Sequence, residues 1–444
     1  DRRFAVGFYY GSLRDRRERV ERLTRILTTY NPTLAANGAY WAPYFCWPVG
    51  MVDGAQSISR DFATRHQLVW PAIGVVTPTY RQNFYFTDRF GQTQEKEVRW
   101  FTGGKASKFV PQAESGSLLT RLQIAVRLTR AVRRLHMAGL AHADLSNKNV
   151  LVDPKGGEAC IIDIDSLVVP GIAPPSVLGT PGYIAPEVLA NKAQPSIATD
   201  KHALAVLLYE LLLQRHPLQG KRVNSTRSAE EDEQLSMGAK ALFVEHPTDR
   251  RNPSVKAIEV ACTRLGPALT HCFTQTFVHG LHAPSQRADA AEWEVALYKT
   301  MRHLFPMSSG KWTILGKGLP MTSLRGDERT ATPVLTAELH QDTGDKVISE
   351  QDSLVLWHHL TLHDWHLLVG ALPDERADRA ARGYVAQHQG KWWLVNTSDV
   401  PWYILDGDTD VLVGRNAPVE CIVGRRVRIG NARPARVLRF DALR

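Results

Sequence analysis

The feature that most constrains the fold is a short polar motif followed by a hairpin pattern in the first half of the chain. Asp144 and Asn149 lie five residues apart, and the strand-like Val-Leu-Val at 150–152 follows them. A turn-forming Asp-Pro-Lys-Gly-Gly at 153–157 leads into a second apolar segment that ends at Asp163. Two short apolar segments joined by such a turn form a β-hairpin. The hairpin brings one amide and two carboxylates together at one end.

Phosphoryl transfer requires this combination of groups. A carboxylate accepts the proton of the attacking hydroxyl, and oxygen ligands hold Mg²⁺ against the phosphates of a nucleotide. The alternative interpretation is a solvated loop with scattered acids, but the spacing, the strand pattern and the turn residues agree with one another. The motif therefore predicts a phosphoryl-transfer centre.

The length of 444 residues leaves room for two or three domains with a sizeable core. The longest apolar run, at 203–213, contains Tyr209 and Glu210 and is too short to span a bilayer. We therefore expect no membrane insertion, and no secretory signal opens the given sequence. The chain starts without Met, close to a predicted strand, which leaves open whether further residues precede Asp1.

Cysteine usage indicates the redox compartment of the protein, and net charge bears on its binding partners. The five cysteines are scattered and form no Cys-x-x-Cys pair, which disfavours a disulfide framework or structural zinc and favours a reducing cytoplasm. The net charge is +9, with arginines dense at 14–25 and 425–444. Because these segments also have the hydrophobic pattern of folded elements, we do not expect a nucleic-acid partner.

Hydrophobic periodicity predicts the elements around the motif. A strand at 4–10, an arginine-rich helix at 13–30 and a second apolar segment at 68–76 open the chain. Helices are expected at 118–137, which delivers the chain into the motif, and at 200–214, which is apolar enough to be buried.

Several motifs in a fixed order resemble a known family. His-Ala-Asp144 with Asn149 resembles a catalytic loop, and Asp163-Ile-Asp165 stands where a magnesium-binding triplet is expected. Gly-Thr-Pro-Gly-Tyr-Ile-Ala-Pro-Glu at 179–187 resembles the end of an activation segment. Asp200, and Arg287 as a partner of Glu187, complete the series. Residues 1 to about 305 thus resemble the eukaryotic-type serine/threonine protein kinase fold in a divergent bacterial version.

The resemblance implies roles for the polar groups, with ATP and Mg²⁺ as cofactors. Asp144 would orient the substrate hydroxyl and partly remove its proton. Asn149 and Asp163 would hold Mg²⁺ against the phosphates. Ser146 replaces the usual lysine of the catalytic loop, and Lys148 would compensate for it, with a solvent-facing role as the alternative.

The resemblance also implies an adenine site. Thr77 would be the gatekeeper, and the backbone at Pro78 and Tyr80 would form the hinge that binds adenine. Ala5 and Leu151 would enclose the base from two sides. The Glu187–Arg287 pair and Asp200 would be structural.

Besides Ser146, two departures from the family bear on activity. The strand lysine that binds phosphates is replaced by Gly7, and no lysine occurs before Lys96. Glu21, or Glu18, is the candidate for the lysine's partner. Ala143 replaces the arginine that senses activation-loop phosphate.

The C-terminal region has a period of two and resembles a forkhead-associated (FHA) domain in its segments 390–407 and 424–430. The phosphate-binding residues of that family are replaced by Ala371, Ala381 and roughly Val400-Pro401. Phosphothreonine recognition depends on charge-assisted hydrogen bonds. We therefore expect a degenerate FHA-like module, with a generic β-sandwich as the alternative.

The expected fold class is α+β, a bilobal kinase-like fold followed by an all-β sandwich. The predicted parts are an N-lobe at 1–80, a C-lobe at 81–305, a linker at 306–350 and the FHA-like sandwich at 351–444. Whether the first strands of the N-lobe precede Asp1 stays open.

Three functions stay open: a serine/threonine protein kinase, a pseudokinase scaffold, and a small-molecule phosphotransferase of the aminoglycoside- or choline-kinase type. The segment 179–187 disfavours the third, since such enzymes lack a peptide-positioning segment. The expected partners are a protein substrate, a cognate phosphatase and other signalling proteins.

Overall fold

The computed structural model describes residues 3–10, 15–54, 57–175, 179–224, 228–316, 334–371 and 380–443. The chain divides into two compact units. The first comprises residues 1–263 and 269–294, and the second comprises 264–268 and 295–444. The division falls inside a continuous helix at Ala290–Met301, so the predicted C-lobe boundary at 305 stays a prediction.

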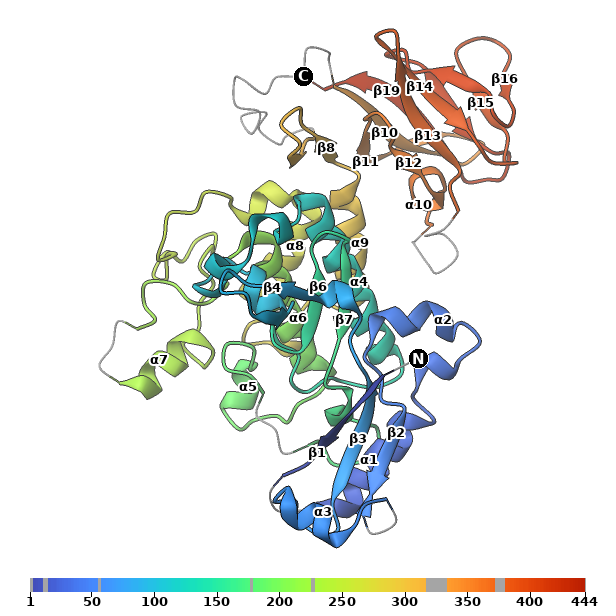
Figure 1. Ribbon diagram of the computed structural model, residues 1–444. Helices are drawn as coiled ribbons and strands as arrows, with labels where there is room; N and C mark the ends of the chain where they lie inside the picture. The colour runs from blue at the N-terminus through green and yellow to red at the C-terminus, as the bar shows by residue number, and fades with distance from the viewer. Residues whose placement is uncertain are drawn as a thin grey trace. The chain divides into compact units, whose positions relative to one another are not determined.

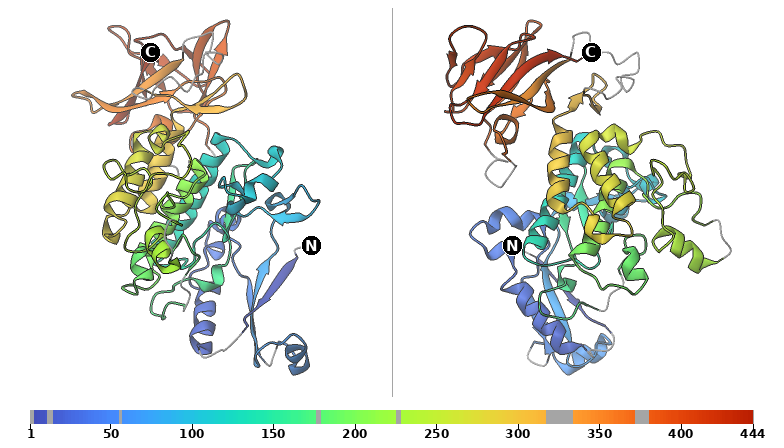
Figure 2. Two further views of the ribbon diagram at one scale, coloured as in Figure 1. Left: turned by 90° about the vertical axis from the view of Figure 1, so that its left-hand side faces the viewer. Right: turned by 180° about the vertical axis from the view of Figure 1, so that it is seen from behind.

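The first unit opens with a small antiparallel sheet, shown in blue in Figure 1. Its strands are β1 (Phe4–Phe8), β2 (Gly50–Asp53) and β3 (Ile73–Pro78), in the order β1-β3-β2. Helix α1 (Arg16–Leu27) packs on one face, where Leu23 contacts Ile73 and Val75. Figure 2 shows α1 against this sheet when the molecule is seen from behind. The apolar stripe of an otherwise arginine-rich helix explains this packing.

Short elements connect the sheet strands to one another and to the helices. They are α2 (Gly38–Trp41), α3 (Arg60–Arg65) and the β4 (Tyr85–Thr87)–β5 (Thr93–Glu95) hairpin. Further along the chain, a capping box at Ser117 begins the long helix α4 (Leu118–Met137), which ends before Gly139 at a φ of 76°.

A helical layer completes the first unit. Helix α6 (Ile197–Leu213) is apolar on all sides and is buried along almost its whole length, as the sequence predicted. The other helices are α5 (Pro186–Leu189), α7 (Ala229–Ser236), α8 (Pro267–Thr274) and α9 (Ala290–Met301), the last of which continues into the second unit.

The hairpin predicted from the central motif is present. Strand β6 (Val150–Asp153) pairs antiparallel with β7 (Glu158–Ile161), with Val150 opposite Ile161. The turn between them needs Gly157, whose φ is 67° and whose added Cβ would lie 2.4 Å from Gln123 Oε1. The open end of the hairpin carries Asn149 and leads to Asp163.

The second unit is a β-sandwich with a small helix, α10 (Asp364–Leu367). One sheet has the strand order β11-β10-β19-β18-β15-β16 and the other has the order β12-β13-β14-β17. Trp402, Val385 and Phe440 are fully buried in its core. The strands are β10 (Leu335–Asp342), β11 (Val347–Val355), β12 (Thr361–Leu362), β13 (Gly383–His388), β14 (Lys391–Asn396), β15 (Trp402–Ile404), β16 (Val411–Val413), β17 (Pro418–Glu420), β18 (Arg426–Ile429) and β19 (Ala435–Ala442).

The prediction of a linker at 306–350 is wrong for most of its described residues. A hairpin of β8 (Leu304–Pro306) and β9 (Trp312–Ile314) opens this segment, and β10 with the start of β11 closes it. Strand β10 buries Leu335, Ala337 and Leu339 between polar residues. The residues between them on the outer face are polar, so the overall composition of the segment resembles that of a linker although its apolar residues alternate. The sandwich therefore begins well before 351.

Candidate active site

The loop before the hairpin is fixed by hydrogen bonds from the helical layer. The His142 backbone N–H donates to Asp200 Oδ2 over 2.7 Å, and the His142 ring Nε2 lies 2.8 Å from the Ile162 carbonyl oxygen. Asp200 stands in the first turn of the buried helix α6, where it also lies 3.2 Å from the His136 ring. His142 therefore holds the loop both to α6 and to the residue that follows β7.

Asp144 has a carboxylate with both oxygens engaged. Its Oδ1 accepts hydrogen bonds from the Thr180 N–H over 2.6 Å and from the Thr180 hydroxyl over 2.8 Å. Its Oδ2 accepts a hydrogen bond from Asn149 Nδ2 over 3.0 Å. Three donors aimed at one carboxylate fix its orientation. The sequence analysis did not predict the contact with Thr180.

Asn149 and Asp163 lie at the open end of the hairpin, as the sequence pattern requires. Because the Asn149 amide nitrogen donates to the carboxylate and carbonyl of Asp144, the amide oxygen is the group left to face a cation. Asp163 adopts a left-handed backbone conformation with φ 61°. Loss of hydration raises the pKa of its carboxyl, and the negative charges of Asp165 and Asp144 add to this, although one side of the residue stays exposed.

These residues fit a magnesium–nucleotide complex. A divalent cation would relieve the repulsion among Asp163, Asp165 and Asp144, and Mg²⁺ prefers oxygen ligands. Among the residues that the structure describes, no three His, Cys, Asp or Glu side chains form a metal site by themselves. In sites of Mg²⁺–nucleotide complexes, one or two protein oxygens and the phosphates share the ion.

Lys148, the other predicted catalytic residue, is exposed, and its charge acts on Glu97. Its backbone N–H lies 3.4 Å from Ser146 Oγ. The two interpretations of the sequence, a catalytic ammonium and a solvent-facing lysine, thus remain predictions, and the observed exposure favours the second.

Two of the predicted adenine residues, Pro78 and Tyr80, line a cavity beside β3. A cavity of about 230 Å³ is lined by Pro78, Tyr80, Cys46 and Phe84 among others. Leu151 is fully buried in a cluster with Cys46 and Phe84, against which Tyr80 packs. Cys46 also places its thiol 3.3 Å from the Pro78 carbonyl oxygen. Cys46 and Phe84 were missed from the sequence because no motif marks them.

Ala5 and Thr77 lie directly opposite each other in the β1–β3 ladder. Ala5 is exposed, while Thr77 is half-buried near the end of β3. The enclosure of a base between Ala5 and Leu151 stays a prediction.

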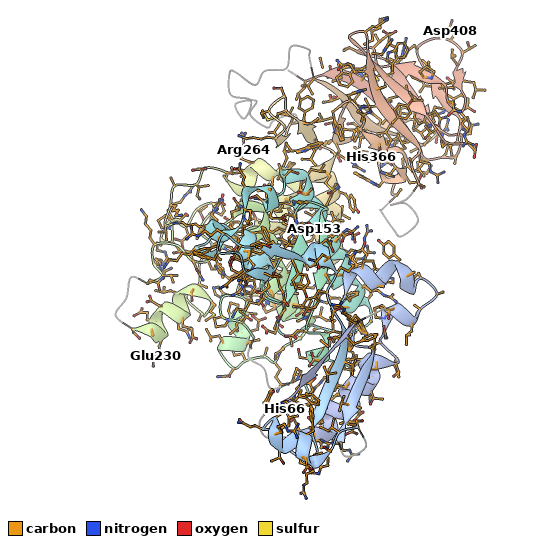
Figure 3. All side chains as sticks on the ribbon, viewed as in Figure 1. His66, Asp153, Glu230, Arg264, His366 and Asp408 are labelled. Atoms are coloured by element: carbon orange, nitrogen blue, oxygen red, sulfur yellow. The ribbon has the colours of Figure 1, made fainter. Side chains whose placement is uncertain are left out.

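Gly7, the position at which the resemblance places a lysine, has free space around it. A Cβ added to Gly7 would meet no atom within 4 Å. Lys96 does not replace that lysine, because it is buried against Glu114 at 2.7 Å and Asp153 at 3.6 Å near the turn of the hairpin. Figure 3 labels Asp153 among the side chains of this region. Glu21, the candidate partner, pairs instead with Arg25 on its own helix.

Tyr9 links the N-terminal strand region to residues 163–165, the predicted metal-binding segment. Its hydroxyl donates a hydrogen bond to Asp165, two residues after Asp163. Burial, with the charge of Asp165, raises the pKa of the Tyr9 phenol well above its usual range. Asp165, which stands at the end of the predicted magnesium-binding triplet, is therefore hydrogen-bonded to Tyr9. Like Cys46 and Phe84, Tyr9 is a residue that no motif revealed.

Comparisons with known proteins agree with this geometry. Residues 103–279 match the family model of the protein kinase domain. The chain contains a kinase-like domain. A dual serine/threonine and tyrosine protein kinase of Xenopus tropicalis is 39% identical over 93 residues, which cover 21% of this chain and 10% of that protein. The proteins of the same name from Gallus gallus and Homo sapiens are 38% identical over 92 and 93 residues, with the same coverage.

The chain thus spans about a tenth of the length of the curated relatives it matches. The matched range of the kinase-like domain includes the catalytic loop, the hairpin and the segment 179–187, but not the N-terminal sheet with Gly7. The predicted Glu187–Arg287 pair is confirmed, with two hydrogen bonds of 2.7 Å. No described helix is long and apolar enough to cross a membrane.

Proposed function

We propose that the kinase-like domain is an ATP- and Mg²⁺-dependent protein kinase of the serine/threonine type. The observation that supports this most directly is the Asp144 carboxylate, held between Thr180 and Asn149. Asp163 lies close enough for its pKa to respond to the Asp144 charge. A fixed base beside a metal-binding carboxylate and amide is the set that phosphoryl transfer uses.

In this proposal the oxygen of a serine or threonine hydroxyl forms a bond to the γ-phosphorus of ATP. The bond from that phosphorus to the β–γ bridging oxygen breaks, and ADP leaves. Asp144 orients the hydroxyl and receives its proton. Asn149 and Asp163 would hold Mg²⁺, which when bound neutralises charge on the phosphates. The protein's own contribution is positioning and a preorganised electrostatic environment.

Packing of the segment 179–187 supports a protein substrate over a small molecule. Tyr183 donates a hydrogen bond from its hydroxyl to the buried Glu210 of α6. The Gly182 carbonyl oxygen lies 3.0 Å from the His216 ring nitrogen. A segment fixed in this way beside Asp144 offers a peptide a preformed surface, which a small-molecule phosphotransferase does not need.

The test is phosphate transfer from γ-labelled ATP by the purified chain, to itself and to a generic substrate such as myelin basic protein. Asp144→Ala and Asp163→Asn should abolish transfer, whereas Glu230→Gln on the exposed helix α7 should leave it unchanged. Equal transfer by wild type and Asp144→Ala would refute the proposal.

Gly7 supports a second candidate, a pseudokinase scaffold that binds nucleotide without turnover. The absence of a side chain removes the cation expected to bind phosphates, and the site around it is open. In that case Mg-ATP would raise the Tm of the chain, while labelled phosphate would stay on ATP. Turnover that depends on Asp144 would exclude the scaffold.

We further propose that the sandwich is an FHA-like interaction module that does not recognise phosphothreonine at the standard position. Ala371 and Ala381 offer no charged or hydroxyl group there, and neighbouring Arg382 is already paired with Asp364 at 2.7 Å. Phosphothreonine peptides should bind no better than their unphosphorylated forms. A cytoplasmic protein with a cognate phosphatase and other signalling partners remains part of this proposal.

A further inference from the structure

A nucleotide in the proposed site would bring several negative charges next to Asp163 and Asp165. Protein cations normally share in neutralising such charge, and kinase sites use a fixed one at the phosphates. Here Gly7 supplies none, and Lys96 is committed to Glu114 and Asp153. The question is which other cation of the first unit reaches this region.

Helix α1 supplies one candidate through Tyr9. The Arg19 guanidinium lies 4.3 Å from the centre of the Tyr9 ring, in cation–π geometry. The hydroxyl of the same ring is hydrogen-bonded to Asp165. The charges of Arg19 and of Asp163 both act on that hydroxyl. One tyrosine side chain therefore connects Arg19 to the metal-binding segment.

The other arginines on this side of α1 are already engaged with the backbone of distant segments. Arg16 donates to the Pro71 carbonyl oxygen over 2.5 Å and also pairs with Asp53. Arg22 donates to the Ala173 carbonyl oxygen over 2.7 Å, and Arg25 donates to that of Pro170 over 2.9 Å.

Arg19 differs from these three residues. Its described hydrogen bond is to Asp15, one turn earlier, at 3.1 Å, and not to the backbone of a distant segment. Its buried Nε has no hydrogen-bond partner among the described residues, which is also true of Arg22. A guanidinium carries five N–H donors, so one ion pair leaves other donors for a ligand. About a quarter of the side chain, 25%, stays exposed, which leaves the group accessible.

We propose that Arg19 takes the place of the missing strand lysine and binds the phosphates of the nucleotide, with the Tyr9 ring as its support. The proposal rests on the proposed ATP-dependent function. Arginine suits the task, because its planar fork of donors matches phosphate oxygens and its face stacks on aromatic rings. The cation would then come from α1, and β1 would need no side chain at Gly7.

The first test measures binding of ATP and of adenosine, both with Mg²⁺, to Arg19→Met and to the matched control Arg17→Met. Arg17 is exposed on the same helix. Arg19→Met should weaken ATP binding about tenfold or more and change adenosine binding by less than about twofold, while Arg17→Met leaves both unchanged. Equal losses for ATP and adenosine would indicate a structural role and overturn the proposal, as would an unchanged ATP affinity.

A rescue experiment uses the open space at Gly7. Gly7→Lys places an ammonium on β1, two residues before Tyr9, where an added side chain meets open space. In the Arg19→Met background it should restore at least about threefold of the lost ATP affinity. No recovery, in a double variant with the wild-type Tm, would count against a shared phosphate-binding role.

A third measurement needs no variant. Phenylglyoxal modifies accessible arginines of the wild-type chain, and mass spectrometry reports the fraction modified at each one. Mg-ATP should protect Arg19 but not Arg17, and adenosine should protect neither. Equal labelling of Arg19 with ATP and with adenosine would overturn the proposal.

All three tests measure binding apart from turnover. Arg19-dependent ATP binding without phosphate transfer would therefore overturn only the proposed kinase activity. A wild-type chain that binds no ATP would overturn both.

Discussion

The two sides of the proposed site differ in how firmly the chain holds them. On the helical side, short hydrogen bonds join His142 to Asp200 of the almost wholly buried α6, and join Asp144 to Thr180. On the side of the small sheet, strand β1 is exposed from Phe4 to Gly7 and pairs with β3 alone among the described strands.

This difference separates two tasks. A base and a metal site must be fixed before the substrate arrives, because misplacement by a fraction of an ångström is costly to catalysis. A cation that binds phosphates can come from any nearby element that reaches them. The helical side carries its residues in the order typical of kinases, and the open side has Gly7 where the resemblance places a lysine. The following predictions test this contrast.

The largest effect is expected from Arg287→Leu on the rigid side. The Arg287 side chain is fully buried and makes a bidentate pair with Glu187. Breaking it leaves a buried carboxylate unpaired, which should lower the free energy of unfolding by about 3–5 kcal/mol. Chemical denaturation followed by circular dichroism measures this change.

The control is Arg81→Ala, which removes a pair with Glu158 whose arginine side chain is 49% exposed. Such surface pairs contribute about 0–1 kcal/mol. Equal losses in the two variants would contradict the assignment of Arg287 as a structural anchor.

A smaller effect, on turnover, is expected from Thr180→Val. The substitution removes the hydroxyl that donates to Asp144 and leaves the backbone N–H in place. The Asp144 carboxylate then loses one of three orienting bonds, and kcat should fall about tenfold to a hundredfold with little change in the KM for ATP. Steady-state kinetics on a peptide substrate tests this, and Thr180→Ser, which keeps the hydroxyl, should stay near wild type.

Acid should destabilise the rigid side through His202. This residue of α6 is completely buried. Burial, followed by the charge of Arg287, holds the pKa of its ring well below its ordinary value of 6.5. The charges of His216 and His282 act in the same direction. The neutral ring is thus the folded form, so stability is complete above pH 6.5.

Stability should then fall as the pH drops below 6.5, by about 1.4 kcal/mol per pH unit for this one group until the folded pKa is reached. Unfolding free energies between pH 7.5 and 5 measure the slope. His202→Phe should flatten it by about one proton, since it removes the group that must be charged. An unchanged slope would show that other groups dominate.

The smallest effect is expected on the open side, from Gly7→Ala. Its added Cβ meets nothing within 4 Å, and its backbone is that of an ordinary strand. The free energy of unfolding should change by less than about 0.5 kcal/mol. Gly38→Ala is the contrast, because its Cβ would lie 2.0 Å from the Thr33 carbonyl oxygen and the variant should lose clearly more. A large loss at Gly7 would mean that this strand is held more tightly than its exposure indicates.

Local sequence patterns were sufficient to predict much of the secondary structure of the first unit. The helix at 118–137 and the hairpin around 150–161 follow from period, capping and turn residues, which act over a few positions. Prediction was least successful at 335–350, because the polar outer face of β10 and β11 hides their alternation. The contacts between Tyr9 and Asp165 and between Thr180 and Asp144 join segments 156 and 36 residues apart, and no local pattern encodes them.

The sequence by itself determined which groups are available: a carboxylate, an amide and a second carboxylate at the open end of a hairpin, with glycine where a lysine is expected. Only the tertiary structure decided how they are oriented and which cation lies nearby. The hydrogen bonds from Thr180 fix the orientation of the Asp144 carboxylate. The Tyr9 ring contacts the Arg19 guanidinium, and its hydroxyl is hydrogen-bonded to Asp165. The reason is physical, since hydrogen bonds and cation–π contacts act over a few ångströms in space, whatever the distance along the chain.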